Sequence, residues 1–223
     1  MPLSHNTISG RIAQLHERMS AEHSDEMLQT FQLERARMRA GGIPPSASAI
    51  GDVIPDVRLL DVYGNTTMLS DAQKERPAVV VLYRGAWCPY CNLTLRTYQE
   101  DLLPTLNKRM IELIAISPQR PDRSLSTQEK EGLTFTVLSD PGNQVATALG
   151  VLTQHSAAIQ HVQCTLGFDV SEFNQDGTHS VPMPTVALID PTRTIQWIDI
   201  RADYATRTEV AVITSALETY DPR

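Results

Sequence analysis

A continuous apolar stretch that leads directly into two closely spaced cysteines is the feature that most limits how this chain can fold. Residues 78–83 read Ala-Val-Val-Val-Leu-Tyr, a run typical of a strand buried on both faces of a sheet. Pro89 then opens a predicted helix over 89–106, with Cys88 just before it and Cys91 about one turn later. Proline suits the first helical turn, because its missing N–H would be unpaired there anyway. This strand-to-helix junction predicts an α/β protein.

The rest of the chain alternates in the same way. We predict further strands at 57–62, 111–116, 134–138, 185–189 and 194–200 and helices at 8–40, 126–132, 143–149 and 206–219, with 150–180 irregular. Two glycines at 41–42 end the first helix. We therefore expect a helical arm with its linker over 1–45 and an α/β domain over 46–223.

Charge and composition exclude several classes of function. The net charge is -7, from 19 basic and 26 acidic side chains, and no basic block points to a nucleic-acid partner. No apolar run approaches the roughly 20 residues that span a bilayer, so we expect no membrane partner. The N-terminal residues lack the pattern of a signal peptide, which favours a cytoplasmic location.

The cysteine pair carries the strongest chemical signal. A sulfur at a helix N-terminus meets unpaired N–H groups and the positive end of the helix dipole. Such a site can lower a cysteine pKa from about 8.5 to roughly 3.5–7.5. Arg84, close upstream of Cys88, adds a cation, and Trp87 is placed to cover the site. A C-x-x-C pair in a chain without a signal peptide favours redox chemistry or metal binding over a structural disulfide.

The chain resembles the peroxiredoxin-like branch of the alkyl hydroperoxide reductase/thiol-specific antioxidant (AhpC/TSA) family, within the thioredoxin superfamily. The resemblance covers about 51–217 and rests on the segments Gly51–Asp56, Tyr83–Asn92, Ala115–Gln119, Leu138–Asn143, Pro182–Thr185 and Asp203–Tyr204. It implies a thioredoxin-like fold, with a central mixed sheet flanked by helices and an N-terminal helical extension.

The resemblance also implies a function. The substrate would be a hydroperoxide or a disulfide, and the electrons would come from thioredoxin, glutathione or another thiol. No organic cofactor and no metal are implied, and a homodimer is expected by analogy. Pro184, followed by Thr185 at the start of a strand, stands where thioredoxin-like folds carry a cis-proline that shapes the site.

The departures from peroxiredoxins leave the roles of the cysteines open. In the peroxiredoxin motif Pro-x-x-x-Thr-x-x-Cys, this chain has Arg84 for Pro, Cys88 for Thr and Cys91 for the peroxidatic Cys. Pro184 stands in the register of the distant Arg that polarises the peroxide. In peroxiredoxin logic Cys91 is oxidised first and Cys88 resolves it; in thioredoxin or glutaredoxin logic Cys88 attacks first. We favour Cys88 as first attacker, because the sulfur at the N-cap is typically more accessible. Both registers end in a Cys88–Cys91 disulfide.

Three alternatives compete with a thiol peroxidase. A disulfide reductase of thioredoxin or glutaredoxin type would use the same pair without peroxidase activity. A zinc site could combine Cys88 and Cys91 with His161 and Cys164. A binding module without catalysis is compatible with the fold, but the intact cysteine pair argues against it. We otherwise expect Cys164 to be a bystander thiol and His155, His161 and His179 to be surface or loop residues.

Overall fold

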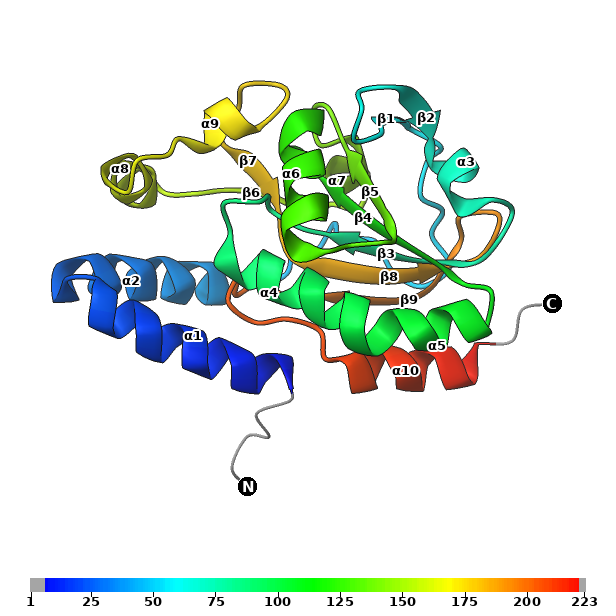
Figure 1. Cartoon of the computed structure of the whole chain (residues 1–223), viewed down its shortest axis with the longest axis horizontal. Helices are drawn as coiled ribbons and strands as arrows, with labels where there is room; N and C mark the ends of the chain where they lie inside the picture. Colours follow the sequence, from blue (N-terminus) through cyan, green and yellow to red (C-terminus); the bar gives the residue numbers. More distant parts are fainter. Residues whose placement is uncertain (1–6, 221–223) are drawn as a thin grey trace.

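A seven-stranded mixed sheet forms the centre of the computed structural model, which describes residues 7–220 (Figure 1). The strand order is β2-β1-β5-β4-β3-β8-β9. The strands are β1 (Arg58–Leu60), β2 (Thr66–Met68), β3 (Ala78–Leu82), β4 (Glu112–Ser117), β5 (Thr136–Ser139), β8 (Thr185–Ile189) and β9 (Ile195–Ile200), with β6 (Leu152–Gln154) and β7 (Ser180–Pro182) in a second, two-stranded sheet. Strands β3, β4 and β5 run parallel, whereas β1, β8 and β9 pair antiparallel with their neighbours.

Helices cover both faces of this sheet. They are α1 (Ile8–Glu22), α2 (Asp25–Gly41), α3 (Leu69–Gln73), α4 (Pro89–Thr97), η1 (Tyr98–Leu102), α5 (Leu103–Lys108), α6 (Pro121–Glu131), α7 (Gln144–Ala148), α8 (Ala157–Thr165), α9 (Val170–Phe173) and α10 (Val210–Thr219). In Figure 1, α4, α5 and α10 lie along one side of the sheet, and α1 and α2 extend away from it at the lower left. Within 7–220, no helix is both long and apolar enough to cross a membrane.

Strand β3 is buried on both faces, as its sequence predicts. All five of its residues are buried, and successive side chains of a strand point to opposite faces. Val79 and Val81 therefore pack into the core under α4, η1 and α5. Val80 and Leu82 pack into the second core, on the other face. The strand is thus fixed from both sides, which fixes the position of the loop that follows it.

The helix predicted over 89–106 is interrupted by a wide turn. It begins at Pro89 as predicted, but α4 gives way to η1, a π-helical turn, before α5 continues to Lys108. Pro104 explains the interruption, because it has no N–H to donate and its ring clashes with the carbonyl one turn earlier. The first two turns, which carry the cysteines, are regular.

The arm consists of two helices rather than the single predicted one. Helix α1 ends near His23, and the Ser24 side chain caps α2 by accepting from the Met27 N–H at 3.4 Å. Gly42, with φ 66°, ends α2 at the predicted place. Ile12 of α1 belongs to the main core, and α1 packs on α4 while α2 packs on α8. The division at 45/46 stays a prediction, and its outer ends, 1–6 and 221–223, lie outside the described residues.

The prediction that the segment 150–180 is irregular is wrong. The segment forms β6, α8, α9 and β7. Ser156 caps α8 and Asp169 caps α9 through side-chain hydrogen bonds, so each short helix begins at a favoured N-cap residue. The segment matters because α8 lies over the cysteine pair.

We expect Ile12→Ala to lower the free energy of unfolding by about 2–5 kcal/mol, because Ile12 is a core residue 7% exposed and the change leaves a cavity. Leu33→Ala, on the exposed face of α2 with the side chain 64% exposed, should change it by less than about 0.5 kcal/mol. Urea unfolding measures both. Equal, small effects would show that the arm is not part of the cooperative core.

Candidate active site

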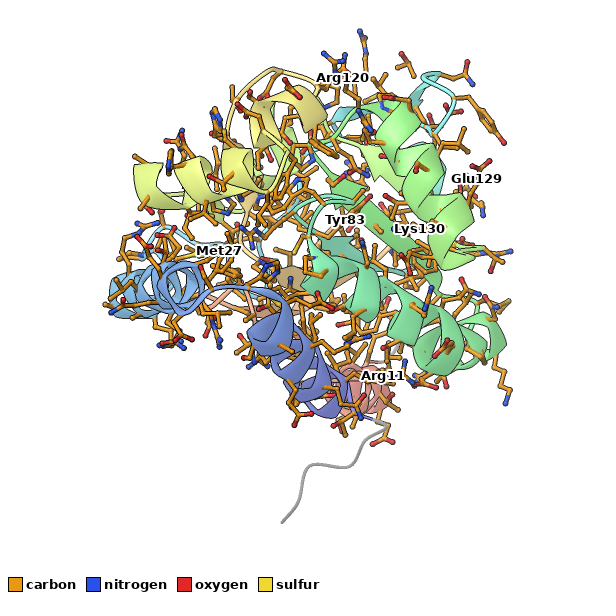
Figure 2. The ribbon with its side chains drawn as sticks, turned by 60° about the vertical axis from the view of Figure 1, so that its left-hand side comes forward. Arg11, Met27, Tyr83, Arg120, Glu129 and Lys130 are labelled. Carbon is orange, nitrogen blue, oxygen red and sulfur yellow. The ribbon has the colours of Figure 1, made fainter. Side chains whose placement is uncertain are left out.

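The loop after β3 has a tight geometry that only glycine allows. Gly85 has φ 141°, a left-handed region that favours glycine. A Cβ atom at this position would lie 2.7 Å from Nε1 of Trp87, closer than real contacts permit. The chain can therefore fold the Trp87 side chain back over the loop. Figure 2 shows Tyr83, at the end of β3, near the centre of the molecule where α4 begins.

Polar side chains hold this loop from both sides. Oε1 of Gln119 accepts the Ala86 N–H at 2.7 Å, and Nδ2 of Asn92 donates to the Ala86 carbonyl at 2.8 Å. The other end of the Gln119 amide donates to the Tyr83 hydroxyl at 2.9 Å. The segment 115–119 that carries the family resemblance thus fixes the loop in front of the cysteines.

Cys88 and Cys91 occupy the predicted positions on α4. Cys88 is the N-cap, Pro89 is the first helical residue, and the Cys91 N–H donates to the Cys88 carbonyl at 3.0 Å. Both cysteines are free thiols, and each is only 1% exposed. We expected Cys88 to be the more accessible cysteine, but its exposed fraction equals that of Cys91. The two sulfurs differ instead in what they face.

Cys88 faces a cavity and Cys91 does not. Cys88 lines a cavity of about 280 Å³ between the arm, α8 and the start of α4. Cys91 borders a void of only about 10 Å³ deeper in the fold. Of the two cysteines, Cys88 is therefore the one that borders a cavity large enough for a small molecule.

Arg207, in the segment between β9 and α10, reaches both sulfurs. Its Nη2 lies 3.3 Å from Sγ of Cys91 and 3.7 Å from Sγ of Cys88. The sequence comparison placed Pro184 in the register of the arginine that peroxiredoxins use. The sequence comparison therefore predicted no arginine beside the two cysteines. In the folded chain, Arg207 takes this place from a later segment.

The cis-proline prediction is wrong. No peptide bond among the described residues is cis, so the bond between Met183 and Pro184 is trans. The chain runs extended from β7 into β8 here, with the Pro184 carbonyl accepting the Arg201 N–H at 2.9 Å, and a trans bond suits such a path. Pro184 still borders the void beside Cys91. Thr185 borders the same void, is buried, and donates its hydroxyl to the Met183 carbonyl at 3.0 Å.

Arg84 is buried between aromatic rings. Its guanidinium carbon lies 4.9 Å from the centroid of the Trp87 ring and 4.3 Å from that of Tyr204. Its Nη2 donates to Nε2 of His155. Arginine is always a donor, so Nε2 of the neutral His155 accepts and its Nδ1–H faces the Gln163 side-chain amide, with Oε1 at 3.3 Å and Nε2 at 3.0 Å. His155, expected at the surface or in a loop, is in fact a buried partner of Arg84.

The surroundings separate the pKa values of the two thiols. Burial alone raises the pKa of Cys91, but the hydrogen bond from the Cys88 thiol and the Arg207 and Arg84 charges outweigh it, together with the Arg84 N–H at 3.4 Å. The pKa of Cys91 is therefore well below its usual value. Burial, the hydrogen bond to Cys91 and the nearby negative charge raise the pKa of Cys88. The closer contact of Arg207 and the Arg84 N–H both favour negative charge on the Cys91 sulfur over the Cys88 sulfur.

Helix α2 anchors the segment that carries Arg207. Asp203 accepts from Nε of Arg35 at 3.0 Å and from Nη1 of Arg39 at 2.7 Å. Its neighbour Tyr204 donates its hydroxyl to a carbonyl of α2 at 3.4 Å. Asp203–Tyr204, for which sequence analysis offered no catalytic role, thus ties the arm to the arginine at the sulfurs.

The same helix anchors the segment that carries His155. The Glu34 carboxylate accepts the Ser156 N–H at 3.2 Å, and Arg37 donates to the Gln154 carbonyl at 3.1 Å. Glu34 is 3% exposed. Burial raises its pKa, but the hydrogen bonds from Arg37 and Ser156 together lower it to about 2. It is therefore charged throughout the ordinary pH range.

The other predicted groups lie apart from the pair. Cys164 is exposed on α8, and His161 is exposed too. His179 pairs with Asp169 at 2.8 Å. No three His, Cys, Asp or Glu side chains gather as metal ligands within 7–220, so the zinc set of Cys88, Cys91, His161 and Cys164 is not assembled.

Sequence reasoning missed Arg207, His155 and the role of Tyr204. Arg207 is a single arginine in a loop, with no motif around it, so no local signal distinguishes it. His155 precedes Ser156, a recognisable N-cap, and a helix there could have been inferred. Asp203–Tyr204 was noticed through the family resemblance alone.

A family model described as the AhpC/TSA family matches residues 50–198, more than half of the chain. The chain belongs to this family. A putative peroxiredoxin of Mycobacterium tuberculosis is 32% identical over 100 residues, which cover 45% of this chain and 62% of that protein. The thiol-disulfide oxidoreductase ResA of Geobacillus kaustophilus is 32% identical over 107 residues, covering 48% of this chain and 60% of ResA. The chain thus spans less than two thirds of these relatives.

Solved structures share the fold. The peroxidoxin BcpB of M. tuberculosis matches with a TM-score of 0.58 and 18% identity, over 77% of this chain and 98% of that one. Reduced Prx3 of Vibrio vulnificus in complex with H₂O₂ matches with a TM-score of 0.61 and 16% identity, over 76% and 99%. The thioredoxin-like architecture predicted from the sequence is confirmed.

We expect Arg207→Met to raise the pKa of Cys91 by about one unit or more, because it removes the cation nearest that sulfur. The thiolate absorbance of the reduced protein, followed against pH in a Cys164→Ser background, measures the change. Arg58→Met, which removes an exposed charge far from the pair, is the control. An unchanged titration in Arg207→Met would refute the electrostatic role of Arg207.

His155 should make stability depend on pH. Burial and the Arg84 charge lower its pKa from 6.5 to about 3, so between these values the unfolded chain binds a proton that the folded one excludes. Stability from this group is lost as the pH falls through that window, by about 1.4 kcal/mol per pH unit. In His155→Gln, the free energy of unfolding, measured with urea at a series of pH values, should fall less steeply with decreasing pH. The difference in slope should be up to about 1.4 kcal/mol per pH unit. Parallel curves for the two proteins would contradict a buried neutral histidine.

Proposed function

We propose that this chain is a thiol-dependent oxidoreductase of peroxiredoxin-like type, which reduces hydroperoxides with Cys88 and Cys91. The observation that carries the proposal is the Arg207 guanidinium in contact with both sulfurs, beside a Cys91 whose pKa is well below its usual value. A thiolate is the nucleophilic form of cysteine. A buried cation next to it also stabilises negative charge on the leaving oxygen.

The first step is attack by the Cys91 thiolate on one peroxide oxygen. An S–O bond forms, the O–O bond breaks, and Cys91 becomes a sulfenic acid while the other oxygen leaves as an alkoxide. That alkoxide takes the proton of the Cys88 thiol and leaves as the alcohol, or as water when the substrate is hydrogen peroxide. Cys88, whose pKa is raised by burial and by its hydrogen bond to Cys91, is the proton donor in this proposal.

The second step forms the disulfide. The new Cys88 thiolate attacks the sulfenic sulfur of Cys91, and hydroxide leaves and is protonated by solvent. Two external thiols, from thioredoxin, glutathione or another donor, then return the pair to the dithiol and become a disulfide themselves. Cys88 lines the cavity, so the external thiol attacks Cys88.

This assignment reverses the sequence-based preference for Cys88 as first attacker. That preference depended on accessibility, and the two sulfurs are equally buried. The charges around the sulfurs support Cys91 as the first attacker instead.

A disulfide reductase is the second candidate, and one observation favours it. Cys88 is the cysteine that lines the cavity, so a disulfide substrate would form its mixed disulfide with Cys88, as in thioredoxin or glutaredoxin logic. A cytoplasmic location, a homodimer and a function without metal or organic cofactor remain part of the proposal by family analogy.

Stopped-flow oxidation of the reduced protein by hydrogen peroxide, followed by tryptophan fluorescence, tests the proposal. We expect oxidation about a hundredfold or more faster than that of the unfolded chain's thiols. Cys91→Ser should abolish the fast phase. Cys88→Ser should slow the fast phase, because the proton donor is lost, without abolishing it, and should stop at a sulfenic acid on Cys91, without turnover by thioredoxin.

The Cys164→Ser variant is the matched control, since Cys164 is an exposed thiol away from the pair, and it should behave as wild type. A rate no better than that of an unfolded thiol in all variants would reject the peroxidase. Fast reaction with a small-molecule disulfide, lost in Cys88→Ser, would then support the disulfide reductase.

A further inference from the structure

The segment between β9 and α10 that carries Arg207, residues 203–209, is fixed to the arm at both ends. In Figure 1 it runs past the end of α2 and the start of α1. At the first end, the Asp203 carboxylate is 6% exposed and accepts from Arg35 at 3.0 Å and from Arg39 at 2.7 Å. Both arginines lie on α2. Hydrogen bonds between ionised groups are among the strong ones in proteins, so α2 fixes this end of the segment.

The second end is fixed to α1. The Glu209 carboxylate accepts the N–H groups of Ile8 and Ser9, at 2.9 Å and 2.8 Å, and the Ser9 hydroxyl also donates to it. Ile8 and Ser9 begin α1, where N–H groups have no partner within the helix and the helix dipole favours a negative charge. Ile8 is 1% exposed and belongs to the main core. Glu209 therefore joins the segment to a part of the arm that is itself fixed.

The backbone between these two ends aims the Arg207 guanidinium. Its Nη1 donates to the carbonyls of Tyr204 and Thr206, the latter at 2.7 Å, while its Nη2 reaches the two sulfurs. Asp203 also shapes this backbone, because its Oδ1 accepts the Ala205 N–H at 2.9 Å. A displacement of Asp203 therefore moves the carbonyls that hold the guanidinium against the sulfurs.

Building on the proposed function, we propose that Asp203 and Glu209 are positioning residues, through which the arm holds Arg207 against the sulfur of Cys91. Both carboxylates act through Arg207 rather than on the sulfurs. The attraction between a cation and a thiolate falls with the distance between them. A small displacement of the guanidinium therefore raises the pKa of Cys91 and slows its attack on the peroxide.

Other contacts hold the same segment without the arm. The Tyr98 hydroxyl donates to the Thr208 carbonyl at 2.7 Å, and the Thr208 hydroxyl donates to Asp199 at 2.6 Å. If these contacts alone fixed Arg207, changes at Asp203 or Glu209 would not reach the sulfurs. The two arrangements therefore predict different results for the same variants.

Asp203→Asn and Glu209→Gln remove each charge with almost no change in shape. In a Cys164→Ser background, we expect each to raise the pKa of Cys91 by about half a pH unit or more, measured by the thiolate absorbance of the reduced protein. Glu100→Gln is the matched control and should leave the titration unchanged. Glu100 accepts from Arg11 of α1 at 3.0 Å and so joins the arm to η1, outside 203–209.

A double-mutant cycle separates positioning from a merely structural role. If Asp203 and Glu209 act through Arg207, neither change should shift the titration further in an Arg207→Met background. Glu209 is only half-buried, so its variant carries the test should Asp203→Asn fail to fold. Shifts of equal size with and without Arg207 would overturn the positioning role, as would unchanged titrations in both single variants.

The rate of oxidation by hydrogen peroxide distinguishes this proposal from the proposed function. Fast oxidation of the wild type, with titrations unchanged in Asp203→Asn and Glu209→Gln, would overturn the positioning role alone. The expected shifts in the titration, with slow oxidation of the wild type, would overturn the proposed function and leave the positioning role.

Discussion

The contact between the Arg207 guanidinium and the sulfur of Cys91 is the interaction on which the rest of the site depends. Each is buried, and a buried charge is tolerated only with a partner. The Arg207 cation lowers the pKa of the thiol, and the sulfurs in turn keep the arginine charged against the cost of its burial. Neither group would be stable here without the other.

Helix α2 holds the segments that bring Arg84 and Arg207, which are far apart in sequence, to the cysteine pair. Arg207 follows Asp203, which α2 holds through Arg35 and Arg39. On the other side, Glu34 and Arg37 of the same helix hold the backbone around His155, and His155 holds Arg84. The arm therefore does more than cover the domain. It sets the positions of both cations around the sulfurs, although it lies far from them in sequence.

Much of this fold was predictable because it depends on local patterns. The apolar run of β3, Pro89 at the first turn of α4 and the glycines at the end of α2 each have a clear sequence signal, and the structure contains all three. The wide turn at Pro104 breaks one predicted helix, and the short elements within 150–180 lack a long periodic pattern. Local signals therefore predicted the cysteine-bearing junction correctly, but they missed the interruption at Pro104 and the short elements of 150–180.

The electrostatic partners of the cysteines could not be predicted in this way. Arg207 lies more than a hundred residues from Cys91 and reaches it only through tertiary packing, so no spacing reveals it. Pro184 illustrates the opposite error, since a resemblance in register placed a cis bond where the extended chain keeps a trans one. The proposed order of attack likewise depends on tertiary charges rather than on position in the helix.

The buried Arg207 has a consequence for the redox balance of the pair. A disulfide between Cys88 and Cys91 carries no negative charge, so oxidation leaves the guanidinium without its anion in the protein interior. Removing one member of a buried ion pair costs roughly 3–5 kcal/mol, and here that cost falls on the oxidised form alone. Each 1.4 kcal/mol raises the reduction potential of a two-electron couple by about 30 mV. In the proposed reaction, the arginine that activates the thiolate would therefore also make the resulting disulfide easy to reduce.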